Sequence, residues 1–99
     1  MTIERMDLMK LKDGFLLREL AGSYVVVPVG QAAVDLRGMI TLNETGAFLW
    51  KQLQTPQTTQ SLCDAMTEVY DVTSEKAGED IARFLQMLSE HGLLEEETA

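Results

Sequence analysis

Two side chains in this sequence have the chemistry of a nucleophile and its base, Cys63 and His91, and the chain holds no other cysteine or histidine. A thiol that attacks a substrate needs a partner that activates it. Cys63 falls between apolar residues at helical spacing, a pattern typical of a packed side chain, and no residue near it in sequence would activate its thiol. His91 falls in the last turn of a predicted helix, where positive charge suits the helix dipole. We therefore expect no catalytic residue.

Metal and cofactor sites are equally poorly supported. A zinc site needs several Cys, His or carboxylate ligands at close spacing, and one Cys with one His is too few. The spacing of a calcium-binding loop is absent, and so are the GxxxxGK[ST] and GxGxxG patterns that cradle phosphates. We interpret Glu79-Asp80 as solvated surface. The sequence predicts neither a metal nor a cofactor.

The charge balance argues against nucleic acid as a ligand. Sixteen acidic and eight basic residues give a net charge of -8, and the basic residues are scattered along the chain. Binding to nucleic acid depends on clustered Lys and Arg. The single cysteine excludes an internal disulfide, and no apolar run is long enough for a signal peptide or a membrane span. These features indicate a cytoplasmic protein.

The first half of the chain is rich in β-forming residues. The pattern predicts two hairpins, each with a short turn. The first comprises strands over 14–20 and 24–28 with a turn at 21–23, and the second comprises strands over 34–36 and 39–42 with a turn at Arg37-Gly38. Pro28 cannot donate to a strand ladder and marks an edge or an end.

The second half predicts three helices, each with a cap signal. Asn43 caps a helix from 44 to about 54, Thr58 caps one to about 70, and Thr73 or Ser74 caps one to about 91, which Gly92 ends in a left-handed conformation. Helical spacing assigns apolar faces to the three, and we expect these faces to form the core. Their members are Gly46, Leu49, Trp50 and Leu53; Leu62, Met66, Val69 and Tyr70; and Ala77, Ile81, Phe84, Leu85 and Leu88.

Strands followed by short helices predict an α+β fold in one domain over 1–99. We expect a small antiparallel N-terminal sheet of three strands, with a fourth as an open alternative, followed by three helices on one side of it. The short connector before the third helix suits a winged helix-turn-helix arrangement. The core should span about 11–95, and 95–99, with its three glutamates, should be a solvated acidic tail.

One polar stripe runs along the third predicted helix beside its apolar face. Lys76, Asp80, Arg83 and Met87 follow one another at i, i+4, i+7 and i+11. The stripe is either a solvent-facing surface with an Asp80–Arg83 pair or one wall of a groove. Periodicity alone favours the solvent-facing surface.

Several segments in order resemble the PqqD-like family. The run from Met39 to Trp50 is similar to the family's LNETG/A segment, and Tyr24 to Gly30 is similar to its second strand. Glu68 to Val72 is similar to the join between two helices, and Ile81 to Leu94 is similar to the closing FLxxLxxxGLL pattern. The resemblance covers about 11–95. Each piece is short, and together they are fairly specific.

The resemblance implies a non-catalytic recognition element for ribosomally synthesised precursor peptides, with a winged-helix-like fold. Such a module binds the leader segment of the precursor and presents the peptide to a separate modifying enzyme, often a radical SAM enzyme. In related domains the leader adds as a strand beside the third strand and lies against the third helix. Carried over by position, this groove comprises Met39, Ile40, Thr41, Leu42, Lys76, Asp80, Arg83, Phe84 and Met87.

Two other functions remain open at this point. The predicted topology also suits a winged-helix DNA-binding transcriptional regulator, which the acidic charge opposes. A small enzyme that uses Cys63 and His91 is the third hypothesis. The sequence leaves open whether the protein is a monomer or a homodimer.

Overall fold

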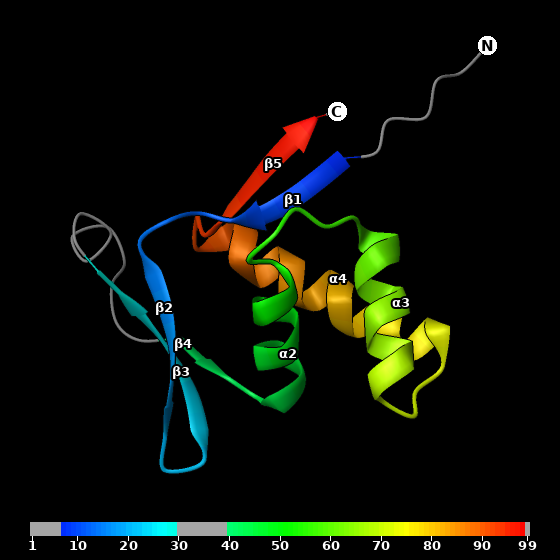
Figure 1. The fold of residues 1–99 in the computed structure, drawn as a ribbon, viewed down its shortest axis with the longest axis horizontal. Helices are drawn as coiled ribbons and strands as arrows, with labels where there is room; N and C mark the ends of the chain where they lie inside the picture. Colours follow the sequence, from blue (N-terminus) through cyan, green and yellow to red (C-terminus); the bar gives the residue numbers. More distant parts are fainter. Residues whose placement is uncertain (1–6, 30–39, 99) are drawn as a thin grey trace.

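The computed structural model describes residues 7–29 and 40–98 and shows an α+β fold, as predicted (Figure 1). A small antiparallel sheet precedes three helices, and a two-stranded ribbon joins the two ends of the described chain. The elements are β1 (Asp7–Leu11), β2 (Phe15–Leu20), β3 (Ser23–Pro28), β4 (Ile40–Leu42), α2 (Glu44–Gln52), α3 (Thr59–Val69), α4 (Ser74–Glu90) and β5 (Leu94–Thr98).

The first predicted hairpin is present, with a tighter turn than expected. Leu20 pairs with Ser23, so only Ala21 and Gly22 lie between β2 and β3. Both have positive φ, 50° and 82°, as the two-residue turns that match the twist of a hairpin require. Ser23, assigned to the turn from sequence, already belongs to β3.

β4 completes a three-stranded sheet in the order β2-β3-β4. It pairs antiparallel with β3, from Tyr24 opposite Leu42 to Val26 opposite Ile40. The other strand of the second predicted hairpin and its turn at Arg37-Gly38 lie outside the described residues. Since β4 is last in this order, one of its edges has no partner strand among residues 7–29 and 40–98.

At the two ends of the described chain, β1 and β5 pair to form a second sheet that was not predicted. Lys10 lies opposite Glu95, and Leu11 lies opposite Leu94. The region around 95–97 was expected to be a solvated tail, and no strand was expected before residue 14. A run of glutamates has low β propensity, and tertiary context overrides it here. Leu93 is fully buried and its carbonyl accepts from the backbone N–H of Lys12, which anchors β5 beside β1.

The three predicted helices and their caps are confirmed. Asn43 Oδ1 accepts from the backbone N–H of Gly46 at 2.8 Å, and Thr58 forms a reciprocal capping box with Ser61. Thr73 caps α4. Gly92, with φ of 70°, follows the last turn of α4 in the expected left-handed conformation. The first helix ends at Gln52, two residues earlier than predicted.

One core cluster joins the three helices to the inner face of the three-stranded sheet and to β1. Its buried members are Met9, Leu11, Val26, Leu42, Leu49, Trp50, Leu53, Leu62, Met66, Ala77, Ile81, Phe84, Leu88 and Leu93. Nearly every apolar residue that the helical faces predicted is therefore in or against the core. None of the described helices is long and apolar enough to cross a membrane.

Val69 is the exception, because its side chain is 61% exposed. It lies in the last turn of α3, which no neighbouring element covers at this position. The next residue, Tyr70, instead packs edge-to-face on Phe48 of α2, with ring centroids 5.4 Å apart. Burial, followed by the nearby Glu44 and Tyr24, raises the pKa of the Tyr70 phenol.

Two truncations in α3 should differ in their effect on the free energy of unfolding, because one lies on the buried face of the helix and the other at its exposed end. Leu62 is fully buried, so Leu62→Ala should lower the free energy of unfolding by about 2–5 kcal/mol through lost burial and a cavity. Val69→Ala, the matched control in the same helix, should change it by less than about 0.5 kcal/mol. Urea denaturation measures both. Equal losses for the two variants would contradict the described packing of α3.

Candidate functional site

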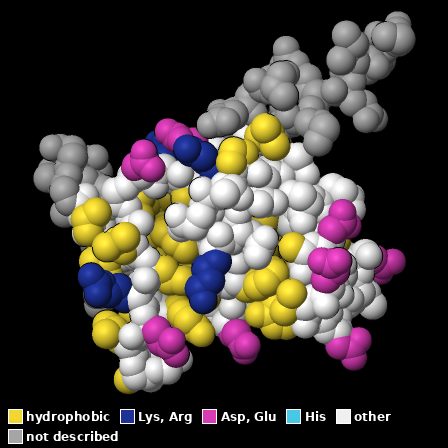
Figure 2. Space-filling model, viewed as in Figure 1, with side chains coloured by type: hydrophobic (Ala, Val, Ile, Leu, Met, Phe, Trp, Pro, Cys, Tyr) yellow, Lys and Arg dark blue, Asp and Glu magenta, His cyan; other side chains and the backbone are white. Residues whose placement is uncertain are grey.

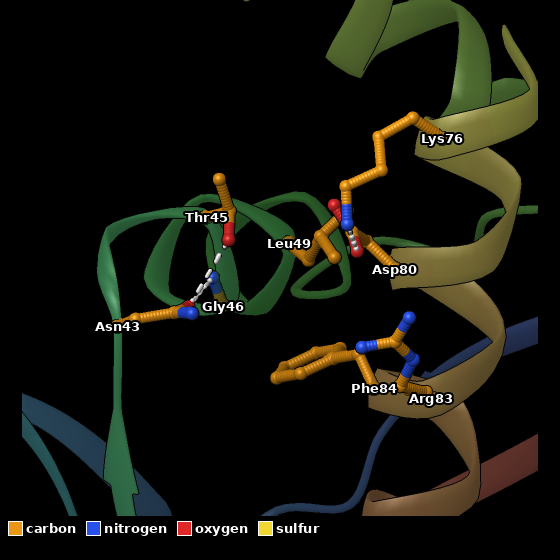
Figure 3. A pocket seen from close by; sticks show the side chains of 8 residues that line it. All are labelled: Asn43, Thr45, Gly46, Leu49, Lys76, Asp80, Arg83 and Phe84. Atoms are coloured by element: carbon orange, nitrogen blue, oxygen red, sulfur yellow. Dashed lines mark hydrogen bonds and ion pairs between the residues drawn. The ribbon is translucent and has the colours of Figure 1, made fainter. Parts of the chain in front are cut away.

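A pocket of about 400 Å³ opens between the start of α2 and one flank of α4 (Figure 3). It is lined by Asn43, Thr45, Gly46, Leu49, Lys76, Asp80, Arg83 and Phe84. One wall comes from the α2 cap and first turns, and the other comes from successive turns of α4. Residues 43–49 and 76–84, which lie 27 or more positions apart in the sequence, thus meet at one concave surface.

The α4 wall carries two cations and one acid. Lys76 Nζ lies 2.8 Å from Asp80 Oδ1, an i, i+4 ion pair whose side chains are both partly exposed. Such a surface pair contributes little to stability. The Asp80–Arg83 pair considered from sequence is not formed, because Asp80 turns back one helical turn toward Lys76. Among the described residues, the exposed Arg83 guanidinium makes neither an ion pair nor a hydrogen bond.

The α2 wall is held in place by the cap of the helix. Asn43 Oδ1 accepts from the Gly46 N–H at 2.8 Å and from Thr45 Oγ1 at 3.1 Å. Both bonds use the carbonyl oxygen of the side chain, which leaves its Nδ2 group as a donor at the pocket wall. The first turn of α2 also contributes the positive end of the helix dipole. The pocket therefore offers donors from both walls.

The floor of the pocket is apolar. Leu49 is 1% exposed and Phe84 is 8% exposed, so both belong to the core and to the pocket at once. Gly46 lies beside both walls: a Cβ there would lie 3.1 Å from Asn43 Oδ1, a tight approach, and 3.5 Å from Phe84 Cε1, an ordinary van der Waals distance. The missing side chain therefore leaves room chiefly for the Asn43 cap. The result is a polar rim above an apolar base.

The structure brings together only part of the predicted groove. Lys76, Asp80, Arg83 and Phe84 all line the pocket. Ile40, Thr41 and Leu42 form β4, which leads directly into Asn43 without lining the pocket. Leu42 is buried in the core, which leaves Ile40, half-buried, and Thr41, exposed, as the more accessible side chains of this strand.

Two other predicted residues stand apart. Met87, one turn further along α4, packs half-buried against the core cluster and does not line the pocket. Met39 lies outside the described residues. The binding role of each predicted groove residue remains a prediction.

Sequence reasoning missed half of the pocket lining, namely Asn43, Thr45, Gly46 and Leu49. It assigned Asn43 to a helix cap and Gly46 and Leu49 to a core face, and both assignments are correct. Periodicity cannot show that a cap and a core residue also border a cavity. The available signal was that these residues belong to the same LNETG segment that carries the family resemblance.

The two candidate catalytic residues are far apart. Cys63 Sγ donates to the carbonyl of Ser74 at the start of α4, at 3.8 Å, whereas His91 is the C-cap at the other end of that helix. The 17 residues of α4 span about 25 Å. The cysteine–histidine pair is therefore not formed. Within the part of the chain that the structure describes, no three His, Cys, Asp or Glu side chains gather as a metal site would need.

An α+β domain whose described residues leave one strand edge without a partner, close to a helix-lined pocket, is suited to binding an extended peptide. The family model of coenzyme PQQ synthesis protein D (PqqD) matches residues 24–94, so the chain belongs to this family. A search of curated proteins finds no match.

Two solved structures share the fold. One is described as TbiB1 in complex with the TbiA(beta) leader peptide, with 21% identity, coverage of 87% of this chain and 94% of that chain, and a TM-score of 0.68. The other is lasso peptide synthetase B1 complexed with the leader peptide, with 20% identity, coverage of 88% and 96%, and a TM-score of 0.67.

The cap that holds the α2 wall can be tested on its own. Asn43→Ala removes the acceptor for the Gly46 N–H and should lower the free energy of unfolding by about 1 kcal/mol. Asn43→Asp keeps an acceptor at the start of the helix and should retain most of the stability. Thermal unfolding of the two variants compares them directly. No loss with Ala, or a loss with Asp as large as that with Ala, would contradict a stabilising role for the side-chain acceptor at this position.

Proposed function

We propose that this protein is a non-catalytic module that binds the leader segment of a ribosomally synthesised precursor peptide. The ligand lies in the β4–α4 groove, which we define as the open edge of Ile40–Leu42 together with the pocket between α2 and α4. The module presents the peptide to a separate modifying enzyme in the cytoplasm, such as a radical SAM enzyme. The whole of 1–99 acts as one recognition domain.

The open edge of β4 beside the pocket is the observation that carries this proposal. An edge strand has unpaired N–H and C=O groups, and an extended peptide satisfies them by adding a strand. β3 occupies one edge of β4, and the other has no partner strand among the described residues. Backbone bonding at this edge would supply affinity that does not depend on the sequence of the peptide.

The pocket would supply the selectivity that the backbone cannot. A peptide strand along β4 passes the start of α2, where the apolar floor of Leu49 and Phe84 lies under the rim. The Arg83 guanidinium, which has no ion-pair or hydrogen-bond partner among the described residues, and the Asn43 amide offer donors at that rim. A side chain with an apolar body and an acceptor at its tip matches these groups.

The comparisons support the same function. Both structural neighbours were solved with a leader peptide bound, and the family match covers β3 from Tyr24 onward, β4 and all three helices. The neighbours are about one-fifth identical to this chain, so their peptides indicate a class of ligand and not its sequence.

The DNA-binding alternative is not favoured. A recognition helix needs several Lys or Arg side chains toward the phosphates. α4 carries Lys76 and Arg83 against Glu75, Glu79, Asp80 and Glu90, on a chain with a net charge of -8. Such a helix repels a phosphate backbone, whereas strand addition needs no net positive charge.

Direct titration tests the proposal. The probe is a fluorescein-labelled synthetic copy of the precursor encoded beside this gene, followed by fluorescence anisotropy. Arg83→Glu should weaken binding at least about tenfold, because it replaces a hydrogen-bond donor at the rim of the pocket with a carboxylate, which repels an acceptor. Lys51→Glu makes the same change of charge on an exposed residue that does not line the pocket, and should bind like the wild type. An absence of saturable binding to the wild type would refute the proposal.

Strand addition has its own signature in the peptide. Successive amides of an added strand point alternately toward and away from β4, so only every second one bonds to it. Copies of the probe with a single N-methylated amide, moved one residue at a time, should show losses of affinity with a period of two. Losses spaced at helical intervals, or no periodicity, would exclude this binding mode.

A further inference from the structure

The pocket between α2 and α4 carries a local positive charge on an acidic protein. Its charged lining residues are Lys76, Asp80 and Arg83, so one positive charge is left unmatched, whereas the whole chain has a net charge of -8. Figure 2 shows acidic side chains spread over separate parts of one face of the molecule. Glu44 and Glu79 neighbour the lining residues in sequence, and neither lines the pocket. A charged ligand group would therefore meet an excess of positive charge here.

The two cations of the pocket differ in their partners. Lys76 Nζ lies 2.8 Å from Asp80 Oδ1, so the charges of this pair already offset each other. Arg83, further along the same flank of α4, has no ion-pair or hydrogen-bond partner among the residues that the structure describes. Figure 3 shows the three side chains projecting from successive turns of α4 toward the start of α2. Arg83 is thus the cation that a ligand engages without breaking an existing pair.

The groups around the pocket favour a carboxylate over other ligand groups. A guanidinium binds a carboxylate through two parallel N–H···O bonds, which are stronger than bonds to a neutral acceptor. The Asn43 amide, whose oxygen is occupied by the α2 cap, offers a further donor on the other wall. A basic side chain would meet Arg83 as a like charge, and the acid in the lining, Asp80, is already paired with Lys76.

The apolar floor suits the carbon stem of an acidic side chain. Leu49 and Phe84 are almost fully buried and form this floor under the polar rim. The methylene groups between the backbone and the carboxylate of an acidic residue would pack on the floor while the carboxylate stays at the rim. The pocket therefore matches both parts of such a side chain.

Lys76 acts on the pocket through Asp80. Asp80 lies three positions before Arg83, a spacing at which two side chains on a helix are able to pair. Its carboxylate instead turns to Lys76, four positions earlier. Without the Lys76 ammonium, Asp80 would pair with Arg83 or repel an incoming carboxylate. The ion pair thus keeps Arg83 available, although it contributes little to stability.

We infer that the pocket takes an aspartate or glutamate side chain of the bound peptide, with its carboxylate on the Arg83 guanidinium, and that Lys76 is a positioning residue that keeps this guanidinium available by holding Asp80. This inference rests on the proposed function. It narrows the ligand from any extended peptide to one with an acidic residue at the position that faces the pocket.

A first experiment locates the acidic residue in the peptide. Each Asp or Glu of the fluorescein-labelled precursor copy is replaced singly by Asn or Gln, and affinity is measured by fluorescence anisotropy. One replacement should weaken binding to the wild type at least about tenfold. The same replacement should change the affinity of Arg83→Gln by less than about twofold, because this variant has lost the charge that distinguishes a carboxylate from an amide. Lys51→Gln, at an exposed position outside the pocket lining, is the matched control and should retain the tenfold difference.

A second experiment tests the positioning role of Lys76. Lys76→Met keeps an apolar stem without the ammonium and should weaken binding of the unaltered probe at least about fivefold. In the Asp80→Asn background the same substitution should cost less than about twofold, because no carboxylate remains to be held. Both side chains are partly exposed, so thermal unfolding of the variants should stay close to that of the wild type. Equal losses of affinity in the two backgrounds would show that Lys76 contacts the peptide directly, and would overturn its positioning role.

Failure of this inference can be distinguished from failure of the proposed function. A wild type that binds the original probe and every amide copy equally would overturn the preference for an acidic residue and leave the proposed function intact. The same conclusion would follow if replacing a Lys or Arg of the probe by Met gave the only large loss. A loss in Arg83→Gln as large as that in the wild type would place the acidic contact away from Arg83. A wild type that binds no probe would refute the proposed function, and this inference with it.

Discussion

Burial of one face of α4 fixes the geometry of the candidate site. Ala77, Ile81, Phe84 and Leu88 are buried at successive turns and hold the helix against the rest of the core. The adjacent flank, with Lys76, Asp80 and Arg83, must then face the start of α2. Phe84 belongs to both surfaces, since its ring is part of the core and of the pocket floor. A change in core packing would therefore move the pocket wall.

Like Phe84, the sheet serves both the fold and the candidate site. Three short strands leave a free edge, and a free edge is a hazard unless it is protected or used. In this domain β4, which has no partner strand on one edge among residues 7–29 and 40–98, leads straight into the capped start of α2, where the pocket begins. A ligand that pairs with the strand is thereby directed toward Arg83 and Phe84. The domain needs neither a catalytic group nor a cofactor for this role.

Local signals were sufficient to predict the helices. Asn43, Thr58 and Thr73 are caps whose side chains bond the first turn, and such chemistry is visible in sequence. Helical periodicity predicted the core residues except Val69, which lies in the last turn of α3 and is exposed because the elements packed against this helix do not cover it. The pairing of β1 with β5 was not predictable in this way, because it joins the two ends of the described chain and sets glutamates opposite a strand of mixed polarity. Contacts of such long range leave no local pattern.

The pocket was predictable only in part for a related reason. The α4 residues were found through their periodicity and a family resemblance, whereas Asn43 and Gly46 were already explained by local roles. A residue that serves both the fold and a site shows only the first role in its spacing. The register of the sheet likewise became visible only when Leu16 was paired with Val27 and Arg18 with Val25.

Hydrogen exchange at the two outer strands tests the central claim most directly. Amide exchange followed by mass spectrometry, with and without a saturating synthetic leader segment of the precursor encoded beside this gene, reports which edge the peptide covers. Strand addition in the β4–α4 groove predicts slower exchange in Ile40–Leu42 of β4 and unchanged exchange in Phe15–Leu20 of β2. Protection of β2 instead, or binding without protection of β4, would contradict strand addition in the β4–α4 groove.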